Sequence, residues 1–212
     1  MDKKFEEILE KGAQVDPIFR EEVLLDEGAV STSVRLAALE EIFSYVNSDD
    51  DFKTVAAKIL AVATKHIPSE AGSFFEIDYK NRDIFFRAIF GKTSDGLLNV
   101  SVPLGAGIVG RVCETQKTEV LSQMKDNSVH LKNIGLLVGF DAKDVVACPV
   151  VIRGVTFGCI ELLNRNGSDK YSQSDIEILE SICKYAAKVI ENRLVVAELY
   201  RRFSAQPAKQ AA

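Results

Sequence analysis

The chain has 212 residues, 47% of them hydrophobic, and a formal net charge of −5 at pH 7. This length and apolar content predict one folded domain with extensions at its ends, and they exclude an intrinsically disordered chain. The net negative charge and the absence of a dense cluster of Lys and Arg argue against nucleic acid as a partner.

Cysteine spacing and hydropathy exclude two further classes. The cysteines form no CxxC pair and are irregularly spaced, so we predict no metal site and four reduced, buried thiols: Cys113, Cys148, Cys159 and Cys183. The stretch MDKKFEEILEK is charged throughout and does not resemble a signal peptide. The longest apolar runs fall far short of the roughly 20 residues that span a bilayer. We therefore expect a cytoplasmic protein that does not enter a membrane.

Two amphipathic helices are predicted after an N-terminal extension of residues 1–32. Ser33 is the expected N-cap of the first helix. The apolar stripe of this helix recurs at spacings of three and four residues: Leu36, Leu39, Phe43 and Val46. The polar stretch NSDDD ends it and begins the second helix, which starts near Phe52 and ends before Pro68.

Three strands are expected next, at residues 71–79, 83–91 and 97–103. The first two are rich in aromatic and β-branched residues and are joined by a hairpin-length turn at residues 80–82. The third alternates apolar and polar side chains, which is the period of a half-buried strand. After a glycine-rich break at 105–107, residues 108–116 have helical character, and residues 119–142 show no firm period.

A second hairpin and a long helix complete the chain. Residues 144–164 predict two strands around a tight turn at Arg153-Gly154, and their near-continuous apolar content indicates a sheet covered on both faces. Residues 173–203 are predicted to form one helix, followed by a flexible tail at 204–212. This order of helices and strands predicts an α+β fold with an antiparallel sheet and helices packed on it.

The apolar stripe of the last helix predicts a homodimer. It steps by three and four residues from Leu179 to Phe203, with Arg193 as its polar member. A stripe of this length exceeds what the domain can cover, so its second half is expected to pair with a second copy, alongside the first helix. The predicted interface residues are Leu36, Leu39, Phe43, Ile182, Val189, Val196 and Tyr200. The alternative is that the whole helix packs on its own sheet and on the N-terminal helices.

Two stretches resemble the GAF domain family. VPLGAGIVGRVCETQKTEV, at 102–120, resembles its strand, glycine-rich turn and helix start, and ACPVVIRGVTFGCIELLNR, at 147–165, resembles its closing hairpin. The resemblance covers about residues 35–200. It implies a domain at 33–203 with an antiparallel sheet of about six strands, terminal helices on one face and a lid of loop and helix on the other. GAF domains are sensory and regulatory modules that often bind cyclic nucleotides, other small molecules or chromophores, and often dimerise through terminal helices.

A degenerate form of one GAF motif follows the closing hairpin. GAF domains that bind cyclic nucleotides carry Asn-Lys, then Phe, then Asp-Glu; the matching residues are Asn164-Arg165, Tyr171 and Asp175, while Ile176 replaces the Glu. The charge of Arg165 at a strand end and that of Asp175 at a helix start favour an ion pair across the turn. We therefore predict that these four matching residues form a structural brace between strand and helix, in preference to a ligand contact.

The resemblance also implies a pocket on the sheet face away from the terminal helices. Its candidate residues are Ser73, Phe75, Ile108, Val109, Phe140 and Glu161. Glu161 stands within an apolar run and requires a hydrogen-bond donor, such as the amino group of a purine; alternatively it lies at the solvent edge or pairs with a Lys or Arg. The expected roof, residues 129–140, is apolar, which favours a smaller apolar ligand or a self-filled pocket over a nucleotide. The glycines at 105, 107 and 110 permit either an anion site or close helix packing.

The function expected from these observations is regulatory and non-catalytic. The chain is predicted to need no cofactor, although it has the potential to bind a cyclic nucleotide or another small ligand, and to act on a signalling partner protein or a further output domain. One alternative is a dimerisation domain with no ligand. A second is a GAF-fold methionine-sulfoxide reductase, which is disfavoured because the cysteines fall in predicted strands and helices. Attachment of a bilin is disfavoured because no cysteine neighbours a histidine.

Overall fold

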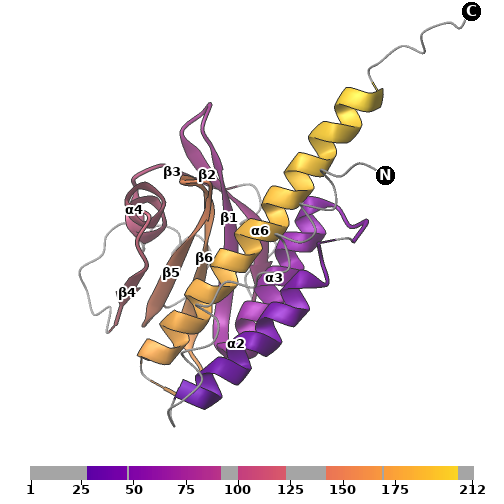
Figure 1. Ribbon diagram of the computed structural model, residues 1–212. Coiled ribbons are helices and arrows are strands. Elements are labelled where there is room, and N and C mark those ends of the chain that lie inside the picture. The colour runs from indigo at the N-terminus through magenta and orange to yellow at the C-terminus, as the bar shows by residue number, and fades with distance from the viewer. Residues whose placement is uncertain (1–27, 47, 92–99, 123–141, 169, 205–212) are drawn as a thin grey trace, which may run out of the picture. The chain divides into compact units, whose positions relative to one another are not determined.

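The computed structural model describes residues 28–46, 48–91, 100–122, 142–168 and 170–204 (Figure 1). The chain divides into two compact units, residues 1–33 and 34–212, and the architecture below is that of the second. Phe140, the rest of the expected roof, most of the N-terminal extension and the expected tail after Ser204 lie outside the described residues.

A six-stranded antiparallel sheet organises the domain, which confirms the predicted α+β fold. The strands run in the order β3-β2-β1-β6-β5-β4, and every neighbouring pair is antiparallel. Their bounds are β1 Ser69–Asp78, β2 Asp83–Phe90, β3 Ser101–Pro103, β4 Glu119–Leu121, β5 Val145–Ile152 and β6 Val155–Arg165. The two longest, β1 and β6, pair at the centre, where both faces of the sheet are covered.

Both predicted hairpins are present, and local chemistry explains their turns. Arg153 and Gly154 have φ angles of 48° and 81°, as a two-residue turn between twisted antiparallel strands requires. Between β1 and β2, the Asp78 carboxylate accepts hydrogen bonds from the backbone N–H groups of Lys80 and Asn81 at 2.9 and 3.1 Å. This side chain closes the turn by bonding the backbone that follows it.

Three helices of this unit cover one face of the sheet: residues 34–43 of α2 (Gly28–Phe43), α3 (Phe52–His66) and α6 (Gln173–Ser204) (Figure 1). Asp51 is the N-cap of α3 and accepts a hydrogen bond from the Thr54 N–H at 2.7 Å. The expected N-cap at Ser33 was wrong, because α2 begins at Gly28 and Ser33 lies within it. The helix continues upstream through residues that show no clear apolar period.

The opposite face is covered by α4 (Gly107–Thr115), which forms a second hydrophobic core with Phe75, Ile84 and Cys159. A Cβ on Gly110 would lie 2.6 Å from the Gly105 carbonyl carbon, so the preceding turn packs directly against this helix. Of the two sequence interpretations of the glycine-rich stretch, the geometry therefore supports close packing at Gly110.

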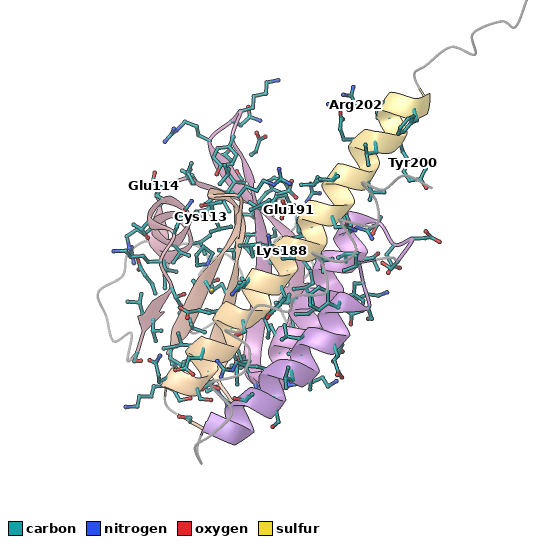
Figure 2. All side chains as sticks on the ribbon, in the orientation of Figure 1. Cys113, Glu114, Lys188, Glu191, Tyr200 and Arg202 are labelled. Carbon is teal, nitrogen blue, oxygen red and sulfur yellow. The ribbon has the colours of Figure 1, made fainter. Side chains whose placement is uncertain are left out.

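The first half of α6 packs on the sheet, and the second half does not. Lys188 and Glu191 lie on the part that crosses the sheet, whereas Tyr200 and Arg202 project from the part beyond it (Figure 2). Ile182 and Val189, which we expected at a dimer interface, are only 1% and 0% exposed within a single chain. That expectation needs correction, because these side chains are used by the chain's own core and offer no surface to a second copy.

Candidate functional site

Glu161 lies on the face of β6 that points towards α4. Side chains alternate along a strand, so Ile160 and Leu162 join the core beneath α3 and α6, whereas Cys159 and Glu161 share the opposite face. In the sheet register, Glu161 is opposite Ser73 on β1 and Ala147 on β5. The carboxyl group is thus flanked by a hydroxyl side chain on one strand and a methyl group on the other.

The carboxyl group of Glu161 is buried in the folded domain. Glu161 is 6% exposed, and its Oε1 atom accepts no hydrogen bond within the part of the chain that the structure describes. Burial raises the pKa of Glu161 to about 7, because desolvation disfavours the charged form. A buried polar atom without a partner is costly, and a donor brought by a ligand would offset that cost.

The other candidate residues described by the structure surround this face. Ser73, Phe75, Ile108 and Val109 are all buried. The rings of Phe75 and Phe86 lie 4.4 Å apart, in the same apolar core as Ile108 and Val109. The surroundings of Glu161 thus combine a hydroxyl group with aromatic and aliphatic side chains, which is typical of a site that orients a small ligand with few polar contacts.

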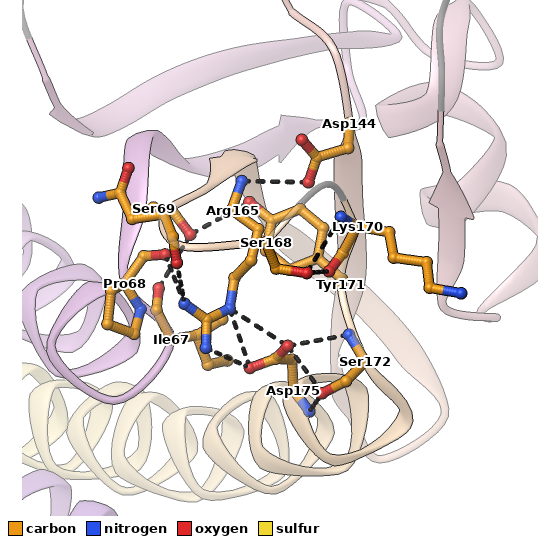
Figure 3. A network of polar contacts seen from close by, with 11 residues as sticks. Ile67, Pro68, Ser69, Asp144, Arg165, Ser168, Lys170, Tyr171, Ser172 and Asp175 are labelled. Carbon is orange, nitrogen blue, oxygen red and sulfur yellow. Dashed lines mark hydrogen bonds and ion pairs between the residues drawn. The ribbon is translucent and has the colours of Figure 1, made fainter.

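A polar network joins the end of β6 to the start of α6 (Figure 3). The Arg165 guanidinium contacts the Asp175 carboxylate, with Nε 3.2 Å from each oxygen. The same guanidinium donates through Nη1 to the Pro68 carbonyl at 3.1 Å and to the Asn166 carbonyl at 2.8 Å. Arg165 therefore connects three elements: the segment before β1, the end of β6 and the first turn of α6.

Asp175 also closes the first turn of its own helix. Its Oδ2 atom accepts hydrogen bonds from the Ser172 N–H at 2.9 Å and the Ser172 hydroxyl at 2.8 Å, and the Ser172 Oγ accepts from the Asp175 N–H at 3.1 Å. This is a capping box with Asp at its third position. Burial opposes ionisation of Asp175, but the hydrogen bonds from Arg165 and Ser172 outweigh it and hold the pKa below its ordinary value.

Asn164 and Tyr171 extend the network to β1 and to the start of β5. Asn164 has a φ of 55°, accepts from the Lys143 N–H at 2.7 Å and donates to Glu70 at 2.8 Å. The Tyr171 hydroxyl donates to the Ser69 Oγ at 3.1 Å, and burial raises the pKa of this phenol. None of these contacts requires a ligand.

Sequence reasoning missed Asp144, a buried member of this network. Its Oδ2 atom accepts from the Arg165 N–H at 3.1 Å, and its carbonyl accepts from the Asn164 N–H at 2.9 Å. An acidic residue directly before an apolar strand was the available signal. Asp144 ties the start of β5 to the end of β6 next to the Arg165–Asp175 pair.

Two features are absent from the described residues. No group of three or more His, Cys, Asp or Glu side chains suited to a metal ion occurs among them. Within the same residues, no helix is long and apolar enough to cross a membrane.

Comparison with known proteins identifies the family. The model of the GAF domain family matches residues 49–191. The chain belongs to the GAF domain family. One curated relative is "Probable 3',5'-cyclic phosphodiesterase pde-5" of Caenorhabditis elegans, which is 21% identical over 155 residues. The match covers 69% of this chain and 21% of that protein, so the chain spans about one fifth of this relative's length.

Solved GAF domains have the same fold. A GAF domain from a phosphoenolpyruvate-protein phosphotransferase of Coxiella burnetii superposes with a TM-score of 0.67 at 15% identity, covering 78% of this chain and 98% of that one. The free methionine-R-sulfoxide reductase of Neisseria meningitidis, solved in complex with its substrate, gives a TM-score of 0.64 at 15% identity, covering 82% and 95%. At these identities the likeness shows the fold, and GAF domains are typically sensory or regulatory modules.

Proposed function

We propose that this GAF domain is a non-catalytic regulatory module that binds a small molecule on the α4 face of its sheet. The observation that carries the proposal is the buried Glu161 carboxyl group, whose Oε1 atom has no partner among the described residues. A ligand that presents an N–H donor, such as an amine or the amino group of a purine, would complete the hydrogen bonding of this carboxyl. The buried aromatic and aliphatic neighbours would hold the rest of the ligand.

Cyclic nucleotides are the first ligand class to test. The degenerate motif retains Asn164 and Asp175, and one relative is named as a probable 3',5'-cyclic phosphodiesterase. In this chain the retained residues bond to the protein itself, through Lys143, Glu70, Arg165 and Ser172. The motif therefore supports a role in coupling, and Glu161 supports the role in binding.

The Arg165–Asp175 pair is the proposed route from the site to α6. Glu161 and Arg165 lie on the same strand, β6, and Asp175 lies in the first turn of α6. If β6 has two conformations, a ligand that binds one of them more tightly would favour that conformation and move the end of the strand. Because Arg165 and Asp175 are paired, the start of α6 would move with it. Such coupling requires two states that differ in affinity for the ligand.

We further propose that the domain forms a homodimer through α2 and α6. Leu36, Phe43, Val196 and Tyr200 are exposed in one chain, and Leu39 is half-buried. We also propose that the protein is cytoplasmic and acts on a separate signalling partner or output domain. The proposed organisation of the chain is an extension at 1–32, a domain at 33–203 and a tail at 204–212. Light scattering over a concentration series tests the dimer.

A thermal-shift series with cyclic mononucleotides, free purines and small amines tests the binding proposal. A ligand at 100 times its Kd stabilises the native state by about 2.7 kcal/mol, which raises the melting temperature. We expect Glu161→Gln to weaken this shift and Glu114→Gln, at an exposed position on α4, to preserve it. If the wild-type domain shows no shift with any of these compounds, the ligand proposal is withdrawn in favour of a dimerisation domain without a ligand.

The reductase fold of one structural relative calls for a direct test of catalysis. All four cysteines are buried, and burial raises the pKa of the Cys159 and Cys183 thiols. A thiol that is not ionised is a weak nucleophile, so this environment supports the non-catalytic proposal. Oxidation of NADPH that depends on free methionine sulfoxide, in a coupled assay with the purified protein, would contradict it.

A further inference from the structure

The cysteines form spatial pairs that their spacing in the sequence does not reveal. Cys148 on β5 and Cys183 on α6 belong to the core beneath α3 and α6, whereas Cys113 on α4 and Cys159 on β6 belong to the core on the opposite face. Within each pair the two thiol groups contact each other. Each pair therefore places two thiols side by side where a helix packs on the sheet.

Cys148 and Cys183 meet where α6 packs on β5. The Cys183 Sγ atom lies 3.6 Å from the Cys148 carbonyl oxygen, and the two residues are only 1% and 3% exposed, respectively. Burial raises the pKa of the Cys183 thiol, and its contact with the Cys148 thiol adds to this effect. A disulfide needs its sulfur atoms about 2.05 Å apart, so bond formation requires a closer approach of two thiols that already touch.

A route for a proton connects this buried pair to solvent. The Thr118 Oγ1 atom lies 2.7 Å from the Glu180 Oε1 atom and 3.5 Å from the Cys148 Sγ atom. A hydroxyl group has one proton and two lone pairs, so while it donates to the Glu180 carboxylate its oxygen can accept from the Cys148 S–H. Thr118 is half-buried and Glu180 is exposed. The proton of a buried thiol can therefore pass through Thr118 to a carboxylate in contact with water.

The second pair has no such route within the described residues. The hydroxyl group of Thr156 donates to the Cys113 carbonyl oxygen at 2.9 Å, away from the sulfur atoms. Burial, and then the neighbouring Cys113 and Glu161, raise the pKa of the Cys159 thiol. Because the thiolate is the reactive form of cysteine, a proton acceptor beside the sulfur favours reaction at Cys148 over this second pair.

We propose that Cys148 and Cys183 form a reversible disulfide when the protein meets a hydroperoxide. Cys148 passes its proton through Thr118 to Glu180, and its sulfur attacks the outer oxygen of the hydroperoxide. The O–O bond breaks, and the leaving alkoxide takes up the released proton to become an alcohol, or water when the oxidant is hydrogen peroxide. The Cys183 sulfur then attacks the sulfenic acid, an S–S bond replaces the S–O bond, and the hydroxyl group leaves with the Cys183 proton as water. The two thiols are oxidised and the peroxide is reduced.

The disulfide would attach the middle of α6 to β5 covalently. This inference does not depend on the ligand proposal, because the pair lies on the helix side of the sheet and Glu161 lies on the other face. Each chain reacts once, without turnover, until a dithiol restores both thiols by exchange. The redox state would thus set how firmly α6 is held on the sheet.

Peptide mapping tests the pairing. The reduced full-length chain is treated with hydrogen peroxide, quenched with iodoacetamide at a series of times, digested without reductant and examined by mass spectrometry. We expect the first product to join position 148 to position 183, about tenfold faster than any product that contains Cys113 or Cys159. A bond between Cys113 and Cys159 that forms as fast, or oxidation of Cys148 without a disulfide, would overturn the inference.

Matched variants test the proton route. Thr118→Val keeps the shape of the side chain without its hydroxyl group, and Thr115→Val makes the same change at an exposed position on α4. Glu180→Gln removes the proton acceptor, and Glu177→Gln is its control one turn earlier on α6. We expect Thr118→Val and Glu180→Gln to slow formation of the disulfide about tenfold or more, and the controls to change it less than about twofold. Equal rates in all four variants, measured where each is folded by circular dichroism, would refute the route.

Thermal unfolding tests the effect on α6. The disulfide form should melt at a higher temperature than the reduced form, because the bond constrains the unfolded chain between residues 148 and 183. Addition of a dithiol should reverse this change. A lower melting temperature of the disulfide form would show that the bond strains the sheet, and would contradict a role in holding α6 in place.

Discussion

Glu161 gives the most demanding prediction, because its environment sets the size and the sign of a pH effect. Burial raises its pKa in the folded protein to about 7, against an ordinary value of 4.5. Well below pH 4.5 the carboxyl is protonated in both states and contributes no pH dependence. Between pH 4.5 and 7 the unfolded chain ionises and the folded chain does not, so the free energy of unfolding falls as pH rises.

The expected magnitude follows from the size of the pKa shift. Each pKa unit corresponds to about 1.4 kcal/mol, so a shift of roughly 2.5 units corresponds to about 3 kcal/mol at pH 8. Glu161→Gln removes the titration while retaining a polar group of similar shape. We therefore expect the stability of the Gln variant relative to wild type to increase by about 3 kcal/mol between pH 4.5 and pH 8. Any cost of the Gln side chain that does not depend on pH cancels in this comparison.

Urea unfolding of both proteins at pH 4.5, 6 and 8, without ligand, measures this difference. Glu114→Gln, which makes the same replacement at an exposed position on α4, is the control. A relative stability of Glu161→Gln that stays constant across these three pH values would mean that the carboxyl is solvated or paired in the folded state. Glu161 would then have no unsatisfied carboxyl oxygen to offer a ligand.

Three further predictions concern the brace, the glycine turn and the end of α6. Arg165→Ala leaves the buried Asp175 without its cation and should lower the free energy of unfolding by about 3 kcal/mol in urea titrations at pH 7. The control, Arg202→Ala, removes an exposed ion pair and should lower the free energy of unfolding by less than about 1 kcal/mol. Equal effects of the two substitutions would contradict the brace. Gly110→Ala places a Cβ within 2.6 Å of the Gly105 backbone and should destabilise the protein by about 1–3 kcal/mol in thermal unfolding. Gly167→Ala is the control for backbone strain alone, because φ is +79° there but nothing lies within 4 Å of the added Cβ. If the proposed dimer forms, Phe203→Glu should convert it to monomer in light scattering without changing the melting temperature of the monomer, because the side chain is exposed. A dimer that is unchanged by this substitution would exclude this end of α6 from the interface.

The sequence was informative where chemistry is local. The tight turn at Arg153-Gly154, the polar stretch that begins α3 and the contact between Arg165 and Asp175 all depend on residues close together in the chain. Composition and spacing predict such features because few residue types satisfy them. The start of α2 could not be predicted in the same way, since Gly28 shows no cap signal.

Features that depend on distant segments were missed or misassigned. The strand β4 has three residues and is defined by its pairing with β5, so periodicity could not reveal it. Ile182 and Val189 belong to the same stripe as Val196 and Tyr200, but the sheet ends between the two pairs. The role of Asp144 depends on β5 and β6 meeting at their ends. Tertiary packing decides all three, and a one-dimensional pattern does not contain it.

A single carboxylate, that of Asp175, both completes the first turn of α6 and binds the guanidinium at the end of β6. Unwinding that turn therefore also breaks the contact between α6 and the guanidinium at the end of β6. The Ile176 N–H donates to the Ser172 carbonyl within this turn. Hydrogen exchange at this amide would therefore report when α6 loses its contact with the end of β6.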